Sequence, residues 1–260
     1  MRLLNECQQT LINLSVRTAQ TKRELADGLV DDFRSLSTKI RGKNVLIKAS
    51  TGYPKPPPFT VDITIVKETV KICRESGAKK ITIIEGSTAL DGARAVASVL
   101  GFDKIEGTEF VDADETLITK VNVENKILWD HLYLPKIVLE SDFKISIAVL
   151  KVEDGKRFYS GVVKNLLGIP PRRIYRGKRP WARGKLHQSL YASVLDLFRA
   201  VNFEYGILDA TEMLMGMANM GKKQLFGKYY FGTDLINIDR TALSDTGHEA
   251  AFAPFAKYLS

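Results

Sequence analysis

Cysteine and histidine are scarce in this 260-residue sequence, and long apolar runs are missing from it. The two cysteines, Cys7 and Cys73, are too few for the four thiolates of an iron–sulfur cluster, so no such cluster is expected on this chain. They also exclude a disulfide framework, which fits a reducing cytoplasm. No stretch approaches the ~18–20 apolar residues that cross a bilayer. Asn5 and Glu6 interrupt the apolar start that a secretory signal would need. We therefore expect a cytoplasmic protein that does not associate with a membrane.

The basic excess is confined to one segment. The chain has 38 Lys and Arg against 30 Asp and Glu. Seven basic and no acidic residues lie in the segment 172–185: Arg172, Arg173, Arg176, Lys178, Arg179, Arg183 and Lys185. Its glycines and prolines predict an irregular loop. Because arginine binds phosphates and carboxylates through paired hydrogen bonds, the segment suits an anionic ligand. A nucleic-acid patch and an ordinary solvated loop are the two other interpretations.

Hydrophobic patterning predicts an α/β fold, with a mainly parallel sheet, helices on both faces and a partly β second half. The first half alternates strands at 44–50 and 80–85 with helices at 62–76 and 89–100, after a helical stretch within 1–40. In the second half we expect a hairpin of 116–123 with 126–129, strands at 139–150, 205–208, 229–231 and 235–238, and helices at 161–167, 186–200 and 242–257. No repeat or linker divides the chain, so we expect one α/β domain over 1–260, with a soft subdivision near 110–140.

Two strand-to-helix junctions carry groups that suit an anion. Lys48 is followed by Ala-Ser-Thr-Gly after the first strand, and Glu85 by Gly-Ser-Thr after the second. The carboxyl ends of parallel strands form the crevice where α/β proteins bind ligands, and glycine beside hydroxyl groups lets backbone N–H groups meet an anion. Neither junction has the spacing of a dinucleotide fingerprint or a Walker A loop. Ordinary capped turns explain each junction equally well when it is taken alone.

A third cluster combines two lysines with an asparagine. Lys151 ends an apolar strand, and Lys164-Asn165-Leu-Leu-Gly follows shortly after it. A lysine among apolar neighbours can act as a base or hold a carboxylate, although Lys164 also fits a surface lysine with a buried stem. We predict Lys164 as a catalytic residue. The predicted substrate-binding residues are Lys48, Lys151, Asn165, Arg172, Arg173 and Arg176.

Acidic residues and one histidine complete the candidate set. Asp209, Glu212, Asp234 and Asp239 stand near predicted strand ends, where they could act as bases, bind Mg²⁺ or cap helices. The three histidines form no metal-binding pair, and His187, beside the basic segment, is the best candidate among them. We predict His187, Asp209 and Asp234 as catalytic residues, and the pattern specifies neither a metal nor a cofactor.

Three segments together resemble the family labelled domain of unknown function 362. The first is Val45-Leu-Ile-Lys48 with its Pro-containing loop and Gly77-Ala-Lys-Lys-Ile-Thr-Ile-Ile-Glu-Gly86. The second is Leu150-Lys151 with Val163-Lys164-Asn165-Leu-Leu-Gly168, and the third is Gly206-Ile-Leu-Asp209 with Gly232-Thr-Asp234 and Asp239. The resemblance implies no reaction. Many members carry an attached iron–sulfur module, for which this chain lacks cysteines. Members also show Lys-x-His where this chain has Lys151-Val-Glu153, so Glu153 either replaces that histidine or the chemistry is lost. The first half is also loosely similar to the nickel-cofactor lactate racemases.

Taken together, these features predict an enzyme of unassigned reaction that binds a small carboxylate or phosphate compound through a Lys/Asn/Arg-rich cleft. The alternative is a nucleic-acid-binding protein that uses the basic segment, with Tyr175 and Trp181 stacking on bases. A third class is a scaffold or an electron-transfer protein that docks a separate redox partner through the same segment.

Overall fold

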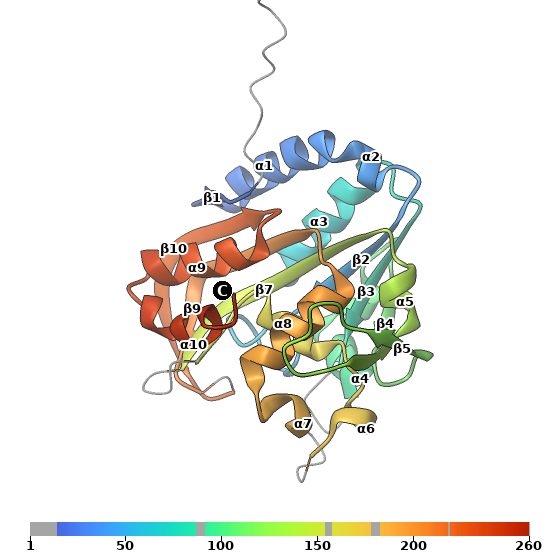
Figure 1. Ribbon diagram of the computed structural model, residues 1–260. Coiled ribbons are helices and arrows are strands. Elements are labelled where there is room, and N and C mark those ends of the chain that lie inside the picture. Colours follow the sequence, from blue (N-terminus) through green and yellow to red (C-terminus); the bar gives the residue numbers. More distant parts are fainter. Residues whose placement is uncertain (1–14, 87–91, 154–157, 178–182, 218, 260) are drawn as a thin grey trace, which may run out of the picture.

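The computed structural model describes residues 15–86, 92–153, 158–177, 183–217 and 219–259, which fold around one large sheet (Figure 1). The strand order is β1-β10-β9-β7-β2-β3-β4, with β8 paired to β7. Strands β2, β3, β4, β7 and β9 run parallel, whereas β1, β8 and β10 are antiparallel to their neighbours. The bounds are Arg17–Ala19 (β1), Asn44–Ala49 (β2), Lys80–Glu85 (β3), Glu109–Asp112 (β4), Phe143–Glu153 (β7), Phe158–Ser160 (β8), Tyr205–Met215 (β9) and Lys222–Gly232 (β10). The predicted α/β class is confirmed.

Helices cover both faces of this sheet. One apolar core contains side chains from α1 (Lys22–Ser35), α2 (Ser37–Ile40), α3 (Ile63–Glu75) and α4 (Gly92–Leu100). The other contains side chains from η2 (Lys164–Gly168), α8 (Leu190–Val201), α9 (Leu235–Asp245) and α10 (Ala253–Ala256). Successive strand residues point to opposite faces, so Val45 and Ile47 join the first core and Leu46 joins the second. This alternation explains why the central strands are apolar along their whole length.

Short elements complete the described chain: η1 (Phe102–Lys104), β5 (Ile118–Asn122), β6 (His131–Pro135), α5 (Lys136–Glu140), α6 (Arg172–Tyr175), α7 (Gly184–His187) and η3 (Glu249–Ala251). None of the helices in the described ranges is both long and apolar enough to span a bilayer. Of the predicted N-terminal helical stretch, 1–14 lies outside the described residues, 17–19 is a strand, and α1 and α2 are helical.

Local signals define the first β-α-β unit well. The Asp62 carboxylate accepts a 2.8 Å hydrogen bond from the Thr64 N–H and caps α3. Gly77, with φ of +85°, lies just beyond the end of that helix, in a conformation that side chains rarely adopt. The predicted helix and both predicted strands of this unit therefore match the structure within one residue.

The predicted hairpin exists, but its second strand lies later in the chain. Strand β5 pairs with β6 at His131–Pro135, whereas the stretch 126–129, predicted as a strand, is a loop. The carboxylate of Asp196 on α8 accepts 2.7 Å hydrogen bonds from the N–H groups of Ile127, Leu128 and Trp129. These bonds replace the ladder that a strand would have formed.

The prediction of a strand at 235–238 is wrong, because these residues begin α9. Asp234 caps the helix by accepting a 3.0 Å hydrogen bond from the Asn237 N–H. The buried residues Leu235, Ile238 and Ala242 follow helical spacing, which extends beyond the four residues predicted as a strand. The predicted helix 242–257 is also divided: α9 ends at Asp245, near Gly247 with φ of +73°, and η3 and α10 follow.

The order of the parallel strands creates a switch point between β2 and β7. From β2 the chain adds β3 and then β4 on one side, and it later returns to place β7 and β9 on the other side. The connections leave β2 and β7 in opposite directions, so a crevice opens beyond their carboxyl ends, where α/β sheets bind ligands.

Candidate functional site

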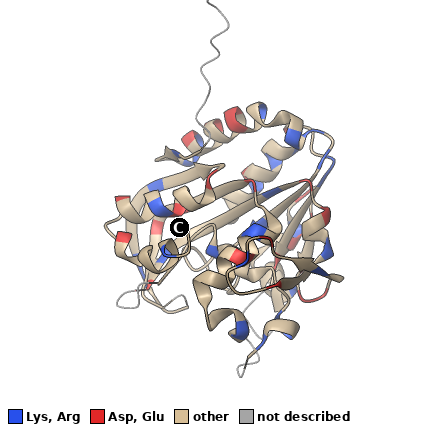
Figure 2. Cartoon of the chain, in the orientation of Figure 1, with Lys and Arg blue, Asp and Glu red and all other residues tan. Residues whose placement is uncertain are grey.

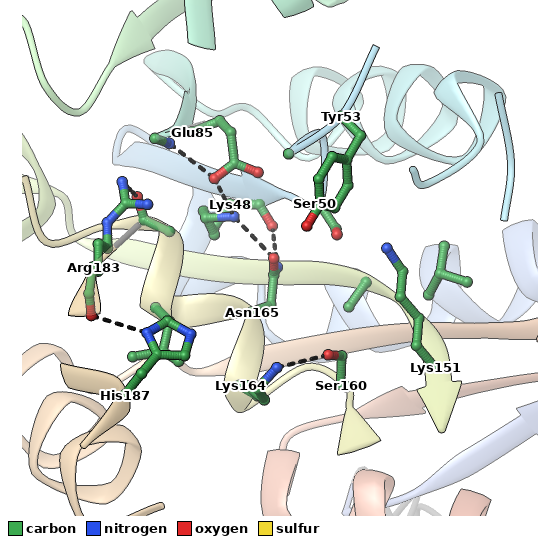
Figure 3. A pocket seen from close by; sticks show the side chains of 17 residues that line it. Lys48, Ser50, Tyr53, Glu85, Lys151, Ser160, Lys164, Asn165, Arg183 and His187 are labelled. Atoms are coloured by element: carbon green, nitrogen blue, oxygen red, sulfur yellow. Dashed lines mark hydrogen bonds and ion pairs between the residues drawn. The ribbon is translucent and has the colours of Figure 1, made fainter. Parts of the chain in front are cut away.

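A cavity of about 240 Å³ lies at this switch point (Figure 3). Its charged and titratable lining residues come from separate parts of the chain: Lys48 of β2, Glu85 of β3, Lys151 of β7, Lys164 of η2, and Arg183 and His187 near α7. Ser50, Tyr53, Ser160 and Asn165 supply further polar groups. The lining therefore contains four cationic side chains and one carboxylate, so it favours an anion.

Lys48 and Glu85 form a buried ion pair at the floor of the cavity. The Lys48 ammonium donates to Glu85 Oε1 at 2.8 Å, to Asn165 Oδ1 at 2.9 Å and to the Ala49 carbonyl oxygen at 3.2 Å. Burial lowers the pKa of Lys48, and the Glu85 carboxylate opposes this shift. Because all three ammonium protons are engaged, Lys48 organises the site and has no N–H group left for a ligand.

Asn165 joins η2 to the ends of two strands. Its Nδ2 group donates to the Lys48 carbonyl at 2.9 Å, to Ser146 Oγ at 3.0 Å and to the Ile147 carbonyl at 3.2 Å. Three residues further on, a Cβ atom on Gly168 would overlap the Glu85 carboxylate and lie 2.6 Å from Lys48 Cε. The asparagine and the glycine of the Lys-Asn-Leu-Leu-Gly motif thus serve the same buried pair.

Lys151 and Lys164 differ from Lys48 because each has N–H groups to spare. Lys151 donates to the Phe59 carbonyl at 2.5 Å, and Lys164 donates to Ser160 Oγ at 2.9 Å. Neither lysine forms an ion pair with a carboxylate among the described residues. Desolvation, reinforced by Lys164, lowers the pKa of Lys151 to about 8, and desolvation lowers the pKa of Lys164 to about 8 against the opposing charge of Glu153. Both lysines are therefore mostly protonated at pH 7.

Asp239 of α9 supports the turn that carries Lys164. Its buried carboxylate accepts hydrogen bonds from the N–H groups of Val162 (2.8 Å) and Val163 (3.1 Å). Desolvation raises the pKa of Asp239 to about 7, while these bonds and the Tyr159 side chain oppose the shift. Asp239 is not a lining residue of the cavity, so it holds the backbone of the site from behind.

The basic segment mostly binds its own chain. Arg183, only 2% exposed, reaches the cavity and donates to the Gly168 carbonyl at 3.0 Å and to the Pro170 carbonyl. Arg172 contacts the Asp114 carboxylate, and Arg173 donates to the Asp114 carbonyl at 3.1 Å. The cavity lining does not include Arg172, Arg173 or Arg176, which were predicted to bind substrate. Figure 2 shows Lys and Arg distributed over many elements, mixed with Asp and Glu. Lys178, Arg179 and Trp181 lie outside the described residues.

His187 lies at the exposed rim of the cavity. Its Nδ1 atom is 2.9 Å from the Arg183 carbonyl oxygen, so the neutral tautomer that donates this bond leaves Nε2 as an acceptor. Desolvation by the surrounding chain and the positive charges of Lys164 and Arg183 lower the pKa of His187. A neutral imidazole beside Lys164 can accept and return a proton near neutral pH.

Asp209 and Asp234, both predicted to be catalytic, lie away from the cavity lining. The Asp209 carboxylate accepts hydrogen bonds from the Thr211 N–H (2.9 Å) and hydroxyl (2.6 Å). Asp234 caps α9 at the end of the sheet where β9 begins, opposite the carboxyl ends of the parallel strands. Glu153, at the end of β7, is not part of the lining either.

The described residues include no group of three or more His, Cys, Asp or Glu side chains placed to hold a metal ion. The donor set of the cavity is instead dominated by ammonium and guanidinium groups, which bind anions and repel cations.

Four lining residues were not predicted individually as binding or catalytic residues: Glu85, Arg183, Tyr53 and Ser160. Glu85 was expected only as part of the second strand-to-helix junction, and Arg183 only as part of the basic segment. Glu85 carried a usable signal, because a carboxylate that ends a β-branched strand needs a buried partner. Arg183 carried none, since nothing in the sequence separates it from the six other basic residues of its segment.

The arrangement defines an α/β protein with a cationic site at the switch point of a mainly parallel sheet. The chain belongs to the family described as domain of unknown function (DUF362), whose profile matches residues 45–244. The resemblance inferred from the sequence is thereby confirmed.

Two solved structures are similar to this chain at low sequence identity, and the first of them shares its fold. A crystal structure of a Thermotoga maritima protein has a TM-score of 0.51 and 12% identity, covering 91% of this chain and 59% of that chain. The lactate racemase apoprotein from Thermoanaerobacterium thermosaccharolyticum has a TM-score of 0.47 and 15% identity, covering 96% of this chain and 57% of that chain. The chain thus spans less than two thirds of either protein. No curated protein sequence matches it.

Proposed function

We propose that this protein is an enzyme that acts on a small organic anion, a carboxylate or a phosphate compound, bound in the switch-point cavity. The observation that carries the proposal is the presence of two lysines, Lys151 and Lys164, in one cavity with N–H groups to spare and no ion pair among the described residues. Desolvated cations without an ion-pair partner among the described residues are unfavourable, so an anion that supplies such a partner gains binding free energy.

Charge repulsion within the site supports the same conclusion. Lys164 lowers the pKa of Lys151, which means that the two ammonium groups repel each other across the cavity. Lys48 is already neutralised by Glu85, and Arg183 is tied to backbone carbonyls. An incoming anion therefore binds chiefly to Lys151 and Lys164, with the Ser50 and Ser160 hydroxyl groups as neutral partners.

Lys164 and His187 are the groups that transfer protons in this proposal. A lysine whose pKa is about 8 exchanges its proton near neutral pH far more readily than an ordinary lysine. The neutral His187 ring at the rim connects Lys164 with solvent. Asn165, Lys48 and Glu85 keep the turn in place and do not react.

The nucleic-acid alternative has less support. Duplex binding by all seven basic residues of 172–185 would give a slope of log K against log salt near ~6 in magnitude. Four of these seven residues already bind groups of their own chain: Arg172, Arg173, Arg183 and Lys185. We therefore expect weak duplex binding with a slope well below that value, and tight binding with the full slope would favour the alternative.

The proposal is tested by thermal unfolding with a panel of short carboxylates and phosphates, for the unmodified chain, Lys151→Gln and the control Lys71→Gln. Lys71 is 60% exposed on α3 and outside the cavity. A ligand at 100 times its Kd stabilises the folded state by about 2.7 kcal/mol. We expect at least one anion to stabilise the unmodified chain and Lys71→Gln but not Lys151→Gln. No stabilisation by any anion, or equal stabilisation of all three chains, would refute the site.

A further inference from the structure

We infer that the Lys164 amine is a nucleophile, which forms an imine with the carbonyl carbon of a small 2-oxo acid held in the switch-point cavity. This inference rests on the proposed function and adds covalent chemistry to it. It follows from the placement of three groups around one cavity: the Lys164 amine, the Lys151 ammonium and the His187 ring (Figure 3).

The contacts of Lys164 suit a reactive amine. Its described polar partner is the neutral Ser160 hydroxyl at 2.9 Å, and it forms no ion pair with a described carboxylate that would hold it protonated. Desolvation, which lowers the pKa of Lys164 against the opposing charge of Glu153, is one of the ways in which proteins activate lysine nucleophiles. With a pKa of about 8, roughly a tenth of the amine is neutral at pH 7, compared with about 0.04% for an unperturbed lysine.

Lys151 is less suited to that role and better suited to holding the substrate. Its ammonium donates to the Phe59 carbonyl and lies 5.8 Å from the centre of the Tyr53 ring, and both contacts favour the charged form. It faces the same cavity as Lys164 and repels it electrostatically, so one compact anion can bridge the space beside both lysines. When the Lys151 ammonium binds the carboxylate of a 2-oxo acid, the adjacent oxo carbon lies toward the Lys164 amine.

The size and polarity of the cavity agree with this substrate class. About 240 Å³ lies just below the ~300 Å³ at which pockets for drug-sized ligands begin, so it suits a compound of a few carbon atoms. Because four cationic side chains, those of Lys48, Lys151, Lys164 and Arg183, line the cavity, it favours an anionic substrate over uncharged aldehydes and ketones.

The reaction balances with groups that are present. The Lys164 ammonium first gives one proton to His187; the neutral nitrogen then forms a C–N bond to the oxo carbon as the C=O π bond breaks, and the oxygen takes that proton from His187 to become the hydroxyl of a carbinolamine. His187 accepts the proton that the nitrogen loses and returns it to the departing hydroxyl, which leaves as water. The products are a protonated imine and one water molecule, without oxidation or reduction.

Reductive trapping tests the inference. The full chain is incubated at pH 7 with pyruvate and sodium cyanoborohydride, which delivers hydride to an imine carbon and fixes it as a secondary amine. We expect one adduct, with the mass of pyruvate plus two hydrogens less one water, mapped to Lys164 by peptide sequencing. Adducts spread over exposed lysines, or located on Lys151, would overturn the inference.

Matched variants separate this inference from the proposed function. Lys164→Arg keeps the positive charge, but its guanidinium, with a pKa above ~12, is not nucleophilic at pH 7, so trapping should fall at least about tenfold. Propionate, which lacks the oxo group, should stabilise the unmodified chain and Lys164→Arg alike, and Lys71→Arg should trap normally. Stabilisation by propionate without a Lys164 adduct would refute the imine alone. Absence of both would refute the anion site as well. Peptide mapping of the unmodified chain decides the matter even if a variant fails to fold.

Discussion

Lys48 and Asn165 bind each other twice, although 117 residues separate them in the sequence. The Lys48 ammonium donates to Asn165 Oδ1 at 2.9 Å, and Asn165 Nδ2 donates back to the Lys48 carbonyl at 2.9 Å. This reciprocal contact fastens η2 to the carboxyl end of β2, and η2 in turn carries Lys164. The catalytic turn in our proposal is therefore positioned by the floor of the cavity.

Replacing this asparagine should weaken the fold measurably. In Asn165→Ala, Lys48 loses an acceptor and the Lys48 and Ile147 carbonyls lose a donor, so we expect a loss of about 1–3 kcal/mol in the free energy of unfolding. Asn122→Ala, on the exposed face of β5, should change stability by less than about 0.5 kcal/mol. Urea denaturation of both variants measures the difference, and equal effects would show that the Asn165 contacts contribute little.

The buried ion pair of Lys48 and Glu85 gives a second prediction. Glu85→Gln leaves the Lys48 ammonium buried without its counter-charge, so we expect a loss of about 3–5 kcal/mol. The exposed pair Lys80–Glu109 is the matched control, with side chains 53% and 54% exposed, and Glu109→Gln should cost about 0–1 kcal/mol. Chemical denaturation provides the measurement. The double variant Lys48→Met/Glu85→Gln should be more stable than Glu85→Gln alone, because it removes the unpaired ammonium group. No gain in the free energy of unfolding would contradict this electrostatic cause.

The sequence predicts what depends on local signals and misses what depends on strand order. The Asp62 cap, Gly77 and the apolar runs at 44–49 and 80–85 are local, and they defined the first β-α-β unit correctly. The loop at 126–129 was mistaken for a strand because its partner, Asp196, lies about seventy residues away.

In the candidate site too, the sequence predicts what depends on local signals and misses what depends on the path of the chain. Lys48, Lys151, Lys164, Asn165 and His187 were predicted individually, and the structure places all of them on one cavity. One arginine of the segment 172–185, Arg183, enters that cavity. Its position depends on the path of the chain after η2, and the periodicity of the sequence carries no information about that path. Asp209 and Asp234 satisfied the same strand-end pattern, yet they cap and brace other parts of the fold.

Anion binding should fall as pH rises through about 8. Lys151 and Lys164 bind an anion in their protonated forms, and desolvation lowers both of their pKa values to about 8. Most of the affinity should therefore be lost between about pH 7 and 9, whereas unperturbed lysines would hold an anion until near pH 10. Calorimetric titration with the anion selected by thermal unfolding measures this profile. Affinity that stays constant to pH 9.5 would exclude these lysines as its ligands.

Asp239 should impose a separate pH dependence on the free energy of unfolding, at lower pH than the loss of anion binding. Its pKa is about 7 in the folded chain and about 3.9 when unfolded, so the folded state binds more protons between these values. Its contribution to stability is therefore present at low pH and lost as pH rises to 7. Asp239→Asn removes this titrating group. The difference in the free energy of unfolding between the unmodified chain and Asp239→Asn should therefore become smaller from pH 5 to pH 8. Urea denaturation across this range measures it, and a difference independent of pH would contradict the assignment.

The most direct measurement is an NMR titration of the lysine side chains, with and without the anion selected by thermal unfolding. A bound anion favours the charged form of the groups that hold it. We predict that the anion raises the pKa values of Lys151 and Lys164 above about 8 and leaves that of Lys71 unchanged. Unchanged pKa values at both cavity lysines, in the presence of saturating anion, would contradict the account.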